Sequence, residues 1–503
     1  MKRIKVFGFL LMNVLAFNAC TKEYGYDFEN GYTTTEFPDT VTVDLDTSMY
    51  KIDRSKYIQA RVFPGMISYD EPRVEDYPVD IDLNYIEVPS SDLRISVAPG
   101  NWTSTGMWAP AGELITIKVP EGVYGLQAQI GAHTDNLTGK DPLQRDPIIY
   151  NRKQLFPGNN YLRNLYGGHV YILPPRPLGK VIQLSFTGTA KAPDFVLGKT
   201  TDAEWKEMIA NTSVPWFELV GKRIVFTLEL SKLKDFPIAS PTELMETWDR
   251  TIREAYWDWT GLKEGNPDPK HRAPFNKWRI VHDIQPSVGA QHSGFPVVAM
   301  NTNGYFQQAV TVDLVKGSNW GTYHELGHNM QQGSTWNFDG NGEVTNNLFS
   351  FKVSQIYGKR HSNMLRSWDA AKTYVVRDSM EKRWVGETVW PGGAKPVNPT
   401  DDAKMSLYTQ VFEKYGYEFM TYLYTAARNA RFTSIDDQSK VDFFYERLSE
   451  FTKTDMYRFM REWGLEVSNT SRKKIAQEFP KLSTKLWLYD PYNRTGGDEP
   501  IID

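Results

Sequence analysis

The feature that most constrains this chain is the segment Tyr323–His328, which contains the H-E-x-x-H pattern within a stretch of helical apolar period. Residues four apart on a helix lie one turn apart on the same face, so His324 and His328 can point at one metal ion. Imidazole nitrogens suit Zn²⁺. Glu325 lies next to them and can hold a water molecule as general base. The segment therefore predicts a helix that carries a catalytic zinc site.

A third metal ligand is predicted at Glu343, which follows the second histidine by 15 residues. The spacing of Val344, Leu348 and Phe351 predicts a second helix with a buried stripe, and Glu343 and Asn347 share another face of it. Two histidines and one glutamate leave the fourth position of a zinc ion for water, which is the pattern of a catalytic site. We expect Asn347 to orient one of the ligands by a hydrogen bond.

The chain has a single cysteine, Cys20, which excludes a disulfide framework and zinc sites built from two or four cysteines. A positively charged start and a short apolar run over residues 6–17 precede it, so residues 1–19 are predicted to be a secretory signal peptide. The segment Phe17–Cys20 resembles the lipobox of bacterial lipoproteins, which implies a lipid on the cysteine thiol. We expect an exported outer-membrane lipoprotein that faces the cell surface. The alternative is a free cysteine after an ordinary signal peptide.

Composition predicts an ordinary globular protein. The 503 residues are 40% hydrophobic, which is enough for a large core, and the length predicts about three domains. The 57 Lys and Arg residues against 61 Asp and Glu residues give a net charge of −4. Nucleic-acid binding driven by overall charge is therefore not expected.

The predicted fold class is α+β multidomain, with an antiparallel β-sandwich followed by a mostly helical metallopeptidase domain. Short apolar runs separated by Gly, Pro, Asn and Asp are typical of a sandwich. Farther on, apolar residues recur every four positions from Leu244 to Tyr256 and mark a helix face. The predicted boundaries are a signal peptide over 1–19, a tether and small β segment over 20–75, the sandwich over 76–194, the zinc metallopeptidase domain over 195–490 and a tail over 491–503.

The motif H-E-L-G-H, followed at this distance by glutamate within Glu-Val-x-Asn-Asn, resembles the enhancin-like, mucin-directed zinc metallopeptidases of the gluzincin clan. The segments 130–137, 166–169, 291–296 and 463–465 also resemble segments of that family. The resemblance covers about 90–480 and implies a β-sandwich followed by a metallopeptidase domain. It implies endopeptidase action on O-glycosylated proteins such as mucins. By position it implies one Zn²⁺ per chain held by His324, His328 and Glu343, with Glu325 as the catalytic glutamate.

The expected reaction is hydrolysis of a peptide bond by a zinc-activated water, with Glu325 taking the water proton and passing it to the leaving amine. The oxyanion needs a further donor. Tyr408 is a candidate, since related clans use a Tyr or His from a later helix; the alternative is a core tyrosine. His292 is a candidate for lining the cleft, and the alternative is a loop histidine that fixes a turn. We interpret His133 and His169 as structural residues of the sandwich.

Three functions remain open from the sequence. The first is a lipid-anchored zinc endopeptidase for O-glycosylated proteins, acting as a monomer, with no nucleic-acid partner. The second keeps the chemistry but does not depend on glycans. The third is a non-catalytic glycan-binding surface lipoprotein. Aromatic faces can stack on sugar rings, and Trp102, Trp108 and Trp336 are candidate platforms; the alternative is core packing. The intact Glu325 argues against the third function.

Overall fold

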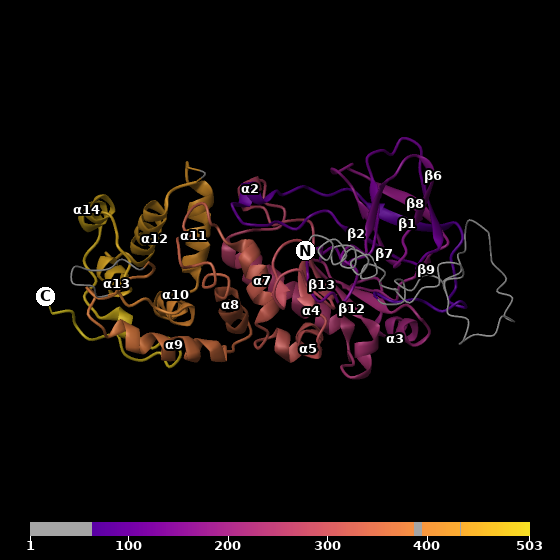
Figure 1. The fold of residues 1–503 in the computed structure, drawn as a ribbon. Helices are drawn as coiled ribbons and strands as arrows, with labels where there is room; N and C mark the ends of the chain where they lie inside the picture. The colour runs from indigo at the N-terminus through magenta and orange to yellow at the C-terminus, as the bar shows by residue number, and fades with distance from the viewer. Residues whose placement is uncertain (1–62, 387–394, 433, 503) are drawn as a thin grey trace, which may run out of the picture. The chain divides into compact units, whose positions relative to one another are not determined.

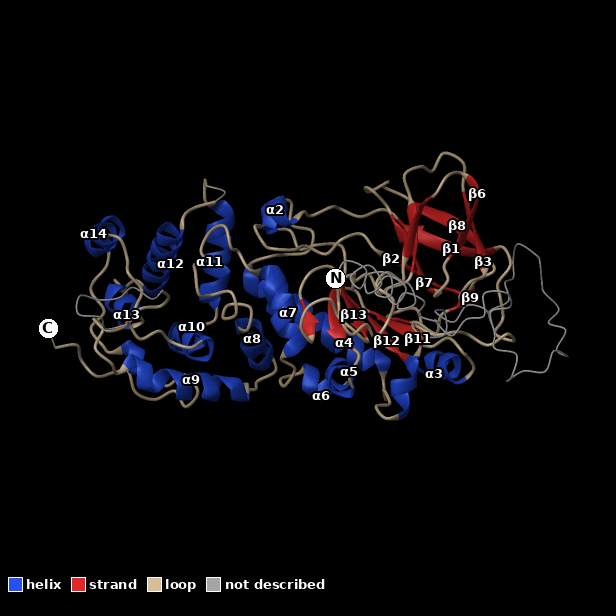
Figure 2. Ribbon diagram, viewed as in Figure 1, coloured by secondary structure: helices blue, strands red, loops and turns tan. Residues whose placement is uncertain are grey.

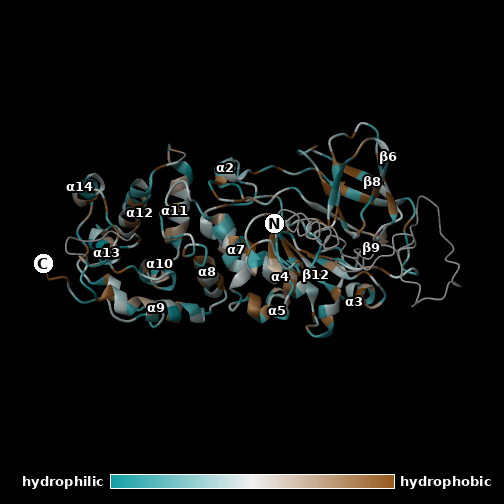
Figure 3. Ribbon diagram, viewed as in Figure 1, coloured by the Kyte–Doolittle hydropathy of each residue, from teal (hydrophilic) through white to brown (hydrophobic). Residues whose placement is uncertain are grey.

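The sandwich forms because its strands alternate buried and exposed side chains, as strands with one covered face do. Along β8 the exposed positions Val181 and Gln183 alternate with the buried Ile182 and Leu184, and Figure 3 shows brown and teal residues side by side on this strand.

The computed structural model describes residues 63–386, 395–432 and 434–502, all of which belong to one compact unit. Cys20, the predicted signal peptide and most of the predicted tether lie outside the described residues. Residues 63–75 are described and contain no strand.

Two antiparallel sheets make the sandwich, and their inner faces share one hydrophobic cluster that draws residues from both. The four-stranded sheet has the order β1-β8-β3-β6, with β1 at Tyr77–Asp82, β8 at Val181–Thr187, β3 at Leu114–Val119 and β6 at Gly158–Arg163. The five-stranded sheet has the order β5-β4-β7-β2-β9, with β5 at Asn151–Gln154, β4 at Gln127–Ile130, β7 at Gly168–Leu173, β2 at Thr103–Ala109 and β9 at Ala190–Lys191.

A six-stranded mixed sheet follows directly after β9. Its order is β10-β11-β12-β13-β15-β14, with β10 at Phe195–Val196, β11 at Trp216–Val220, β12 at Ile224–Glu229, β13 at Trp278–Asp283, β15 at Val297–Met300 and β14 at Gln291–His292. β12, β13 and β15 run parallel, whereas β14 pairs antiparallel with β15 and forms the edge. Every residue of β11 and of β13 is buried, as expected for strands covered on both faces.

Helices make up most of the second half of the chain, and Figure 2 shows them in blue after the last red strand. Figure 1 shows α7, the helix that carries the H-E-x-x-H pattern, beside α8, and α7 also packs against β14 and β15. The α-helices are α2 (Ser90–Leu93), α3 (Asp202–Ala210), α4 (Pro241–Thr251), α5 (Asn303–Val310), α6 (Val312–Val315), α7 (Gly321–Met330), α8 (Leu348–Ile356), α9 (Ser362–Val375), α10 (Asp401–Tyr415), α11 (Glu418–Asn429), α12 (Asp437–Thr452), α13 (Tyr457–Glu462) and α14 (Asn469–Glu478).

The sandwich and the mixed sheet are joined through buried polar groups. The Glu218 carboxylate on β11 accepts hydrogen bonds from Tyr171 on β7 and from Ser104 on β2, at 2.8 and 2.5 Å, and pairs with Arg279 on β13. All of these groups are satisfied by one another, which is the condition for burying charge. The two-sheet sandwich and the mostly helical second half confirm the predicted fold class. The mixed sheet lies between the sandwich and the helices.

Within the described residues, no helix is both long enough and apolar enough to cross a membrane.

Candidate metal centre

Three side chains converge at the face of α7, at the separations that a tetrahedral zinc ion requires. The Nε2 atoms of His324 and His328 lie 3.2 Å apart. Oε2 of Glu343 lies 3.2 Å from the first of these nitrogens and 3.4 Å from the second. Zinc ligands at about 2.0–2.1 Å in tetrahedral geometry are separated from one another by roughly 3.3–3.4 Å. The three atoms therefore fit three corners of a zinc tetrahedron.

The ring orientation of both histidines is set by side-chain amides. Oδ1 of Asn347 lies 2.7 Å from Nδ1 of His324, and Oε1 of Gln331 lies 3.0 Å from Nδ1 of His328. An amide oxygen only accepts, so each Nδ1 carries the proton and each Nε2 bears the lone pair that a metal would use. At His328 this lone pair also faces Nδ2 of Asn346, which lies 2.9 Å from Nε2. The Gln331 amide is itself fixed, because its Nε2 donates to the Gly342 carbonyl at 2.7 Å and to Thr345 Oγ1 at 2.9 Å.

Glu343 reaches the histidines from a run of turns, not from a helix. α8 begins only at Leu348, so the prediction that Glu343 and Asn347 share a helix face is wrong. The two residues are linked instead by a hydrogen bond from Asn347 Nδ2 to the Glu343 carbonyl at 2.8 Å. Gly327 makes the approach possible, because a Cβ there would overlap the carbonyl oxygen of Asn346. The glycine of H-E-L-G-H therefore lets the turn pack directly on α7.

Glu325 also lies beside the histidines, but its carboxylate is farther from Nε2 of His324 than that of Glu343. Its Oε1 is 3.9 Å from Nε2 of His324, and its side chain is 10% exposed. Its carboxylate and the two imidazoles also form a group whose potential metal-binding atoms all lie within 4.8 Å of one another. We assign Glu343 as the third ligand because its oxygen is closer to both nitrogens. Burial raises the pKa of Glu325, and the two histidines oppose this shift.

Gln291 and Tyr305 pack against the first turn of α7, and sequence reasoning did not single out either residue for this site. A Cβ on Gly321 would overlap Oε1 of Gln291 and would lie 3.0 Å from Cε1 of Tyr305. Gly321 precedes Glu325 by one turn, and helical side chains lean toward the preceding turn. Burial and the charge of Glu325 raise the pKa of Tyr305. Among the described residues no group hydrogen-bonds the Tyr305 hydroxyl, and no sequence motif marks this tyrosine.

His292 lies on the edge strand β14, which packs against α7. Its Nε2 lies 2.7 Å from Oδ2 of Asp135, and its Nδ1 lies 2.8 Å from the Ser293 carbonyl. The side chain is 21% exposed. Both ring nitrogens are thus engaged within the protein, and neither is free to donate to a substrate.

The structure does not bring Tyr408 to the metal centre. Its side chain is fully buried, and its hydroxyl donates to Oδ1 of Asn341 at 2.9 Å. A phenol enclosed in the core cannot reach a substrate oxyanion, so the core alternative is the one observed. Trp102, Trp108 and Trp336 are 9%, 1% and 0% exposed and offer no face to a sugar.

The chain is similar over most of its length to several known proteins. It is 28% identical to TRPM8 channel-associated factor 1 of Bos taurus over 433 residues, which cover 83% of this chain and 44% of that protein. The human TRPM8 channel-associated factor 2 is 26% identical, with 82% of this chain and 42% of that protein covered. The chain thus spans less than half the length of the curated relatives it matches.

Solved structures share the fold. A conserved protein of unknown function from Bacillus anthracis has a TM-score of 0.68 at 22% identity, covering 85% of this chain and 84% of that one. The ZmpB metallopeptidase from Clostridium perfringens has a TM-score of 0.64 at 17% identity, covering 85% and 86%. The M60 catalytic domain of Clostridium perfringens ZmpC, in complex with the sialyl T antigen, has a TM-score of 0.63 at 15% identity, covering 83% of each chain.

Two family profiles match consecutive parts of the chain. Residues 85–208 match the N-terminal domain of M60-like peptidases, and residues 188–464 match Peptidase M60, enhancin and enhancin-like. The second match covers more than half of the chain and includes α7 and the 341–347 turn. The resemblance inferred from the H-E-L-G-H motif is therefore confirmed, and the chain belongs to the Peptidase M60 family, enhancin and enhancin-like.

Proposed function

We propose that the protein is a zinc metalloendopeptidase that cleaves peptide bonds in O-glycosylated, mucin-like proteins. The observation that carries the proposal is the set of three ligand atoms, 3.2 to 3.4 Å apart, beside the carboxylate of Glu325. Two similar structures support the substrate class, because one is described in complex with the sialyl T antigen and another is a metallopeptidase in complex with the Tn antigen.

The chain's own residues divide the work of hydrolysis. His324, His328 and Glu343 would hold the zinc ion, which supplies Lewis-acid polarisation when bound. Glu325 accepts a proton from the attacking water and delivers it to the leaving amine nitrogen. Asn347 and Gln331 keep each histidine in the tautomer whose Nε2 bears the lone pair.

Tyr305 is our candidate for the donor that stabilises the oxyanion, in place of Tyr408. Its ring packs at the first turn of α7, its hydroxyl has no hydrogen-bond partner among the described residues, and the charge of Glu325 acts on it. A hydroxyl without a partner in the protein can donate where negative charge develops. The helix that supplies it, α5, precedes the H-E-x-x-H helix in the chain.

Dependence on the glycan is tested with a matched pair of substrates. A peptide carrying a mucin-type O-glycan and its deglycosylated twin are incubated with the full chain, and kcat/KM is compared. We expect the glycopeptide to be cleaved faster. Equal rates would overturn the glycan dependence and leave a general zinc peptidase, whereas binding of the glycopeptide without cleavage would favour the non-catalytic glycan-binding alternative.

We also propose that the protein is exported and anchored in the outer membrane by a lipid on Cys20. The support is the sequence alone: the charged start, the apolar run over 6–17 and the position of the only cysteine. In Cys20→Ser, we expect the protein to leave the membrane fraction. If the variant remains in the membrane fraction as the wild type does, this cysteine is not the anchor.

A further inference from the structure

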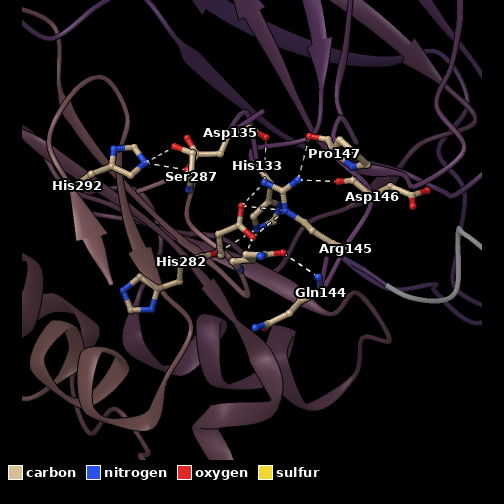
Figure 4. Close-up of polar contacts among 11 residues, drawn as sticks. His133, Asp135, Gln144, Arg145, Asp146, Pro147, His282, Ser287 and His292 are labelled. Atoms are coloured by element: carbon tan, nitrogen blue, oxygen red, sulfur yellow. Dashed lines mark hydrogen bonds and ion pairs between the residues drawn. The ribbon is translucent and has the colours of Figure 1, made fainter. Parts of the chain in front are cut away.

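The segment 131–150, which joins β4 to β5 of the sandwich, is fastened to the connection between β13 and β14. Arg145 donates to the Asp283 carboxylate through Nε at 2.8 Å and through Nη2 at 2.7 Å, and neither side chain is exposed. Nη2 of Arg145 also donates to the carbonyl of Asp135 at 3.1 Å. One arginine therefore fixes both the end of β13 and the backbone at Asp135. Figure 4 shows Arg145 with its dashed contacts close to Asp135.

Two further contacts hold the same pair of segments together. Oε1 of Gln285 accepts from the Gln144 backbone N–H at 2.7 Å, and its Nε2 donates to the Pro142 carbonyl at 2.9 Å. Nε2 of His133 lies 3.0 Å from the His282 carbonyl and donates to it. The path of the chain between β13 and β14 is therefore set by groups of the sandwich.

The Asp135 carboxylate lies at the centre of this contact. Its Oδ2 accepts from the Ser287 backbone N–H at 2.6 Å and from Nε2 of His292 at 2.7 Å. The other ring nitrogen of His292 faces the Ser293 carbonyl at 2.8 Å. A carboxylate and a carbonyl can only accept, so these two contacts fit an imidazolium with a proton on each ring nitrogen. The Ser287 hydroxyl is a further neighbour, with Oγ 3.2 Å from Nε2. Figure 4 shows its ring directed at Asp135.

This imidazolium lies next to the metal centre. His292 and Gln291 form β14, which packs against α7, and Gln291 Nε2 lies 3.5 Å from Oγ1 of Thr322. The charged groups that face His292 are Asp135 from the sandwich and Glu325 from α7. Burial opposes the charge on the ring, and the hydrogen bond to Asp135, the backbone bond and the two carboxylates outweigh it, so the pKa of His292 is raised.

We propose that Asp135 is a positioning residue of the peptidase site: through its ion pair with His292, the sandwich holds the edge strand β14 in place beside Glu325. The inference rests on the proposed function. It assigns the sandwich a part in catalysis, because the group that fixes this wall of the site comes from residues 131–150 and not from the domain that carries the metal ligands.

The sign of the pH effect follows from the raised pKa. Because the pKa of His292 is raised, the imidazolium persists to a higher pH than in an ordinary histidine, and the ion pair is lost as the pH rises through the pKa of His292 in the folded protein. In Asp135→Asn the side chain keeps its size and an acceptor but loses its charge, so the pKa of His292 falls. The alkaline decline of kcat/KM should therefore begin at a lower pH in the variant than in the wild type.

The test compares the full-length wild type with Asp135→Asn, His292→Gln and the double variant, using kcat/KM against pH on the O-glycopeptide. A displacement of about 1 Å in a catalytic site costs roughly 10²-fold, so we expect Asp135→Asn to lose about 10- to 100-fold at neutral pH with its zinc content unchanged. The double variant should be no worse than the more impaired single variant. Asp141→Asn, an exposed position on the same segment, is the matched control and should behave as the wild type.

Imidazole NMR of His292 provides a readout that does not depend on cleavage. In the wild type both ring nitrogens should be protonated at pH 7, and the titration should move to lower pH in Asp135→Asn. A wild-type His292 that is neutral at pH 7, or an Asp135→Asn variant with the wild-type pH profile, would overturn the inference. If the wild type cleaves nothing, the proposed function fails, and the titration still decides whether the ion pair exists.

Discussion

The histidines of α7 and two buried histidines, His133 of the sandwich and His282 of β13, show how the surroundings decide what the same side chain does. His324 and His328 are 22% and 19% exposed, with Nδ1 held by a neutral amide and Nε2 directed at a shared point. His133 and His282 are 3% and 1% exposed. Burial lowers the pKa of His133 to about 4 and that of His282 to about 3. The first pair is arranged to bind a cation, and the second is kept neutral inside the core.

The largest expected effect comes from removing one corner of the metal centre. His324→Ala should abolish zinc binding and peptidase activity, because two ligands cannot hold the ion as three do. Zinc content by mass spectrometry and cleavage of the glycopeptide are the measurements. His271→Ala, a histidine of the 269–271 turn outside the cluster, is the control and should keep both. A His324→Ala variant with a full complement of zinc would contradict the ligand assignment.

The second effect concerns the oxyanion. Tyr305→Phe removes only the hydroxyl, and loss of one such donor lowers kcat by about 10²- to 10³-fold. Zinc content should not change, because Tyr305 does not belong to the ligand set. Tyr124→Phe, at a tyrosine that is 63% exposed in the sandwich, is the control. Wild-type kcat in Tyr305→Phe would remove this residue from the mechanism.

The third effect tests whether neutral amides orient the ligands. Asn347→Ala removes the acceptor for Nδ1 of His324 and should weaken zinc affinity by about 10- to 100-fold. Asn347→Asp keeps an acceptor oxygen in the same place and should lose less. Competition with a chelator measures both affinities. Equal losses in the two variants would indicate that the hydrogen bond to His324 is not what matters.

The last effect concerns stability and not activity: it involves the buried histidines and is measured on the metal-free protein, so that zinc loss does not contribute. The pKa of His133 in the folded protein, about 4, is below its ordinary value of 6.5. Between these two pH values His133 is protonated in the unfolded chain but neutral in the folded protein. The free energy of unfolding should therefore fall as the pH drops from about 6.5 to 4, by about 3 kcal/mol for this residue. His133→Gln should reduce this dependence. A flat profile in the wild type would contradict the neutral, buried state.

The local parts of the site were predictable from the sequence, because they depend on helical spacing. His324, Glu325 and His328 lie within one turn of α7, and Val344 and Leu348 are buried as their spacing predicts. The family resemblance and the order of sandwich and metallopeptidase domain could also be inferred.

The remaining parts depend on contacts between distant segments. Asp135 and His292 are 157 residues apart in the chain, and Tyr305 reaches α7 through the packing of a separate helix. Tyr408 lies in a pattern that fits a core residue as well as a site residue, and its burial and its bond to Asn341 distinguish the two. The 341–347 turn has a helical apolar period, yet Gly327 allows it to approach α7 in another conformation.

Central to the proposed function is Glu325 as the general base of a zinc site whose ligands are His324, His328 and Glu343. The most direct measurement is cleavage of the O-glycopeptide by Glu325→Gln, with zinc determined in the same sample. Glutamine keeps the shape of the side chain but cannot take the water proton. We expect one zinc ion per chain and no detectable cleavage. Cleavage at the wild-type rate, or a wild type without zinc, would contradict it.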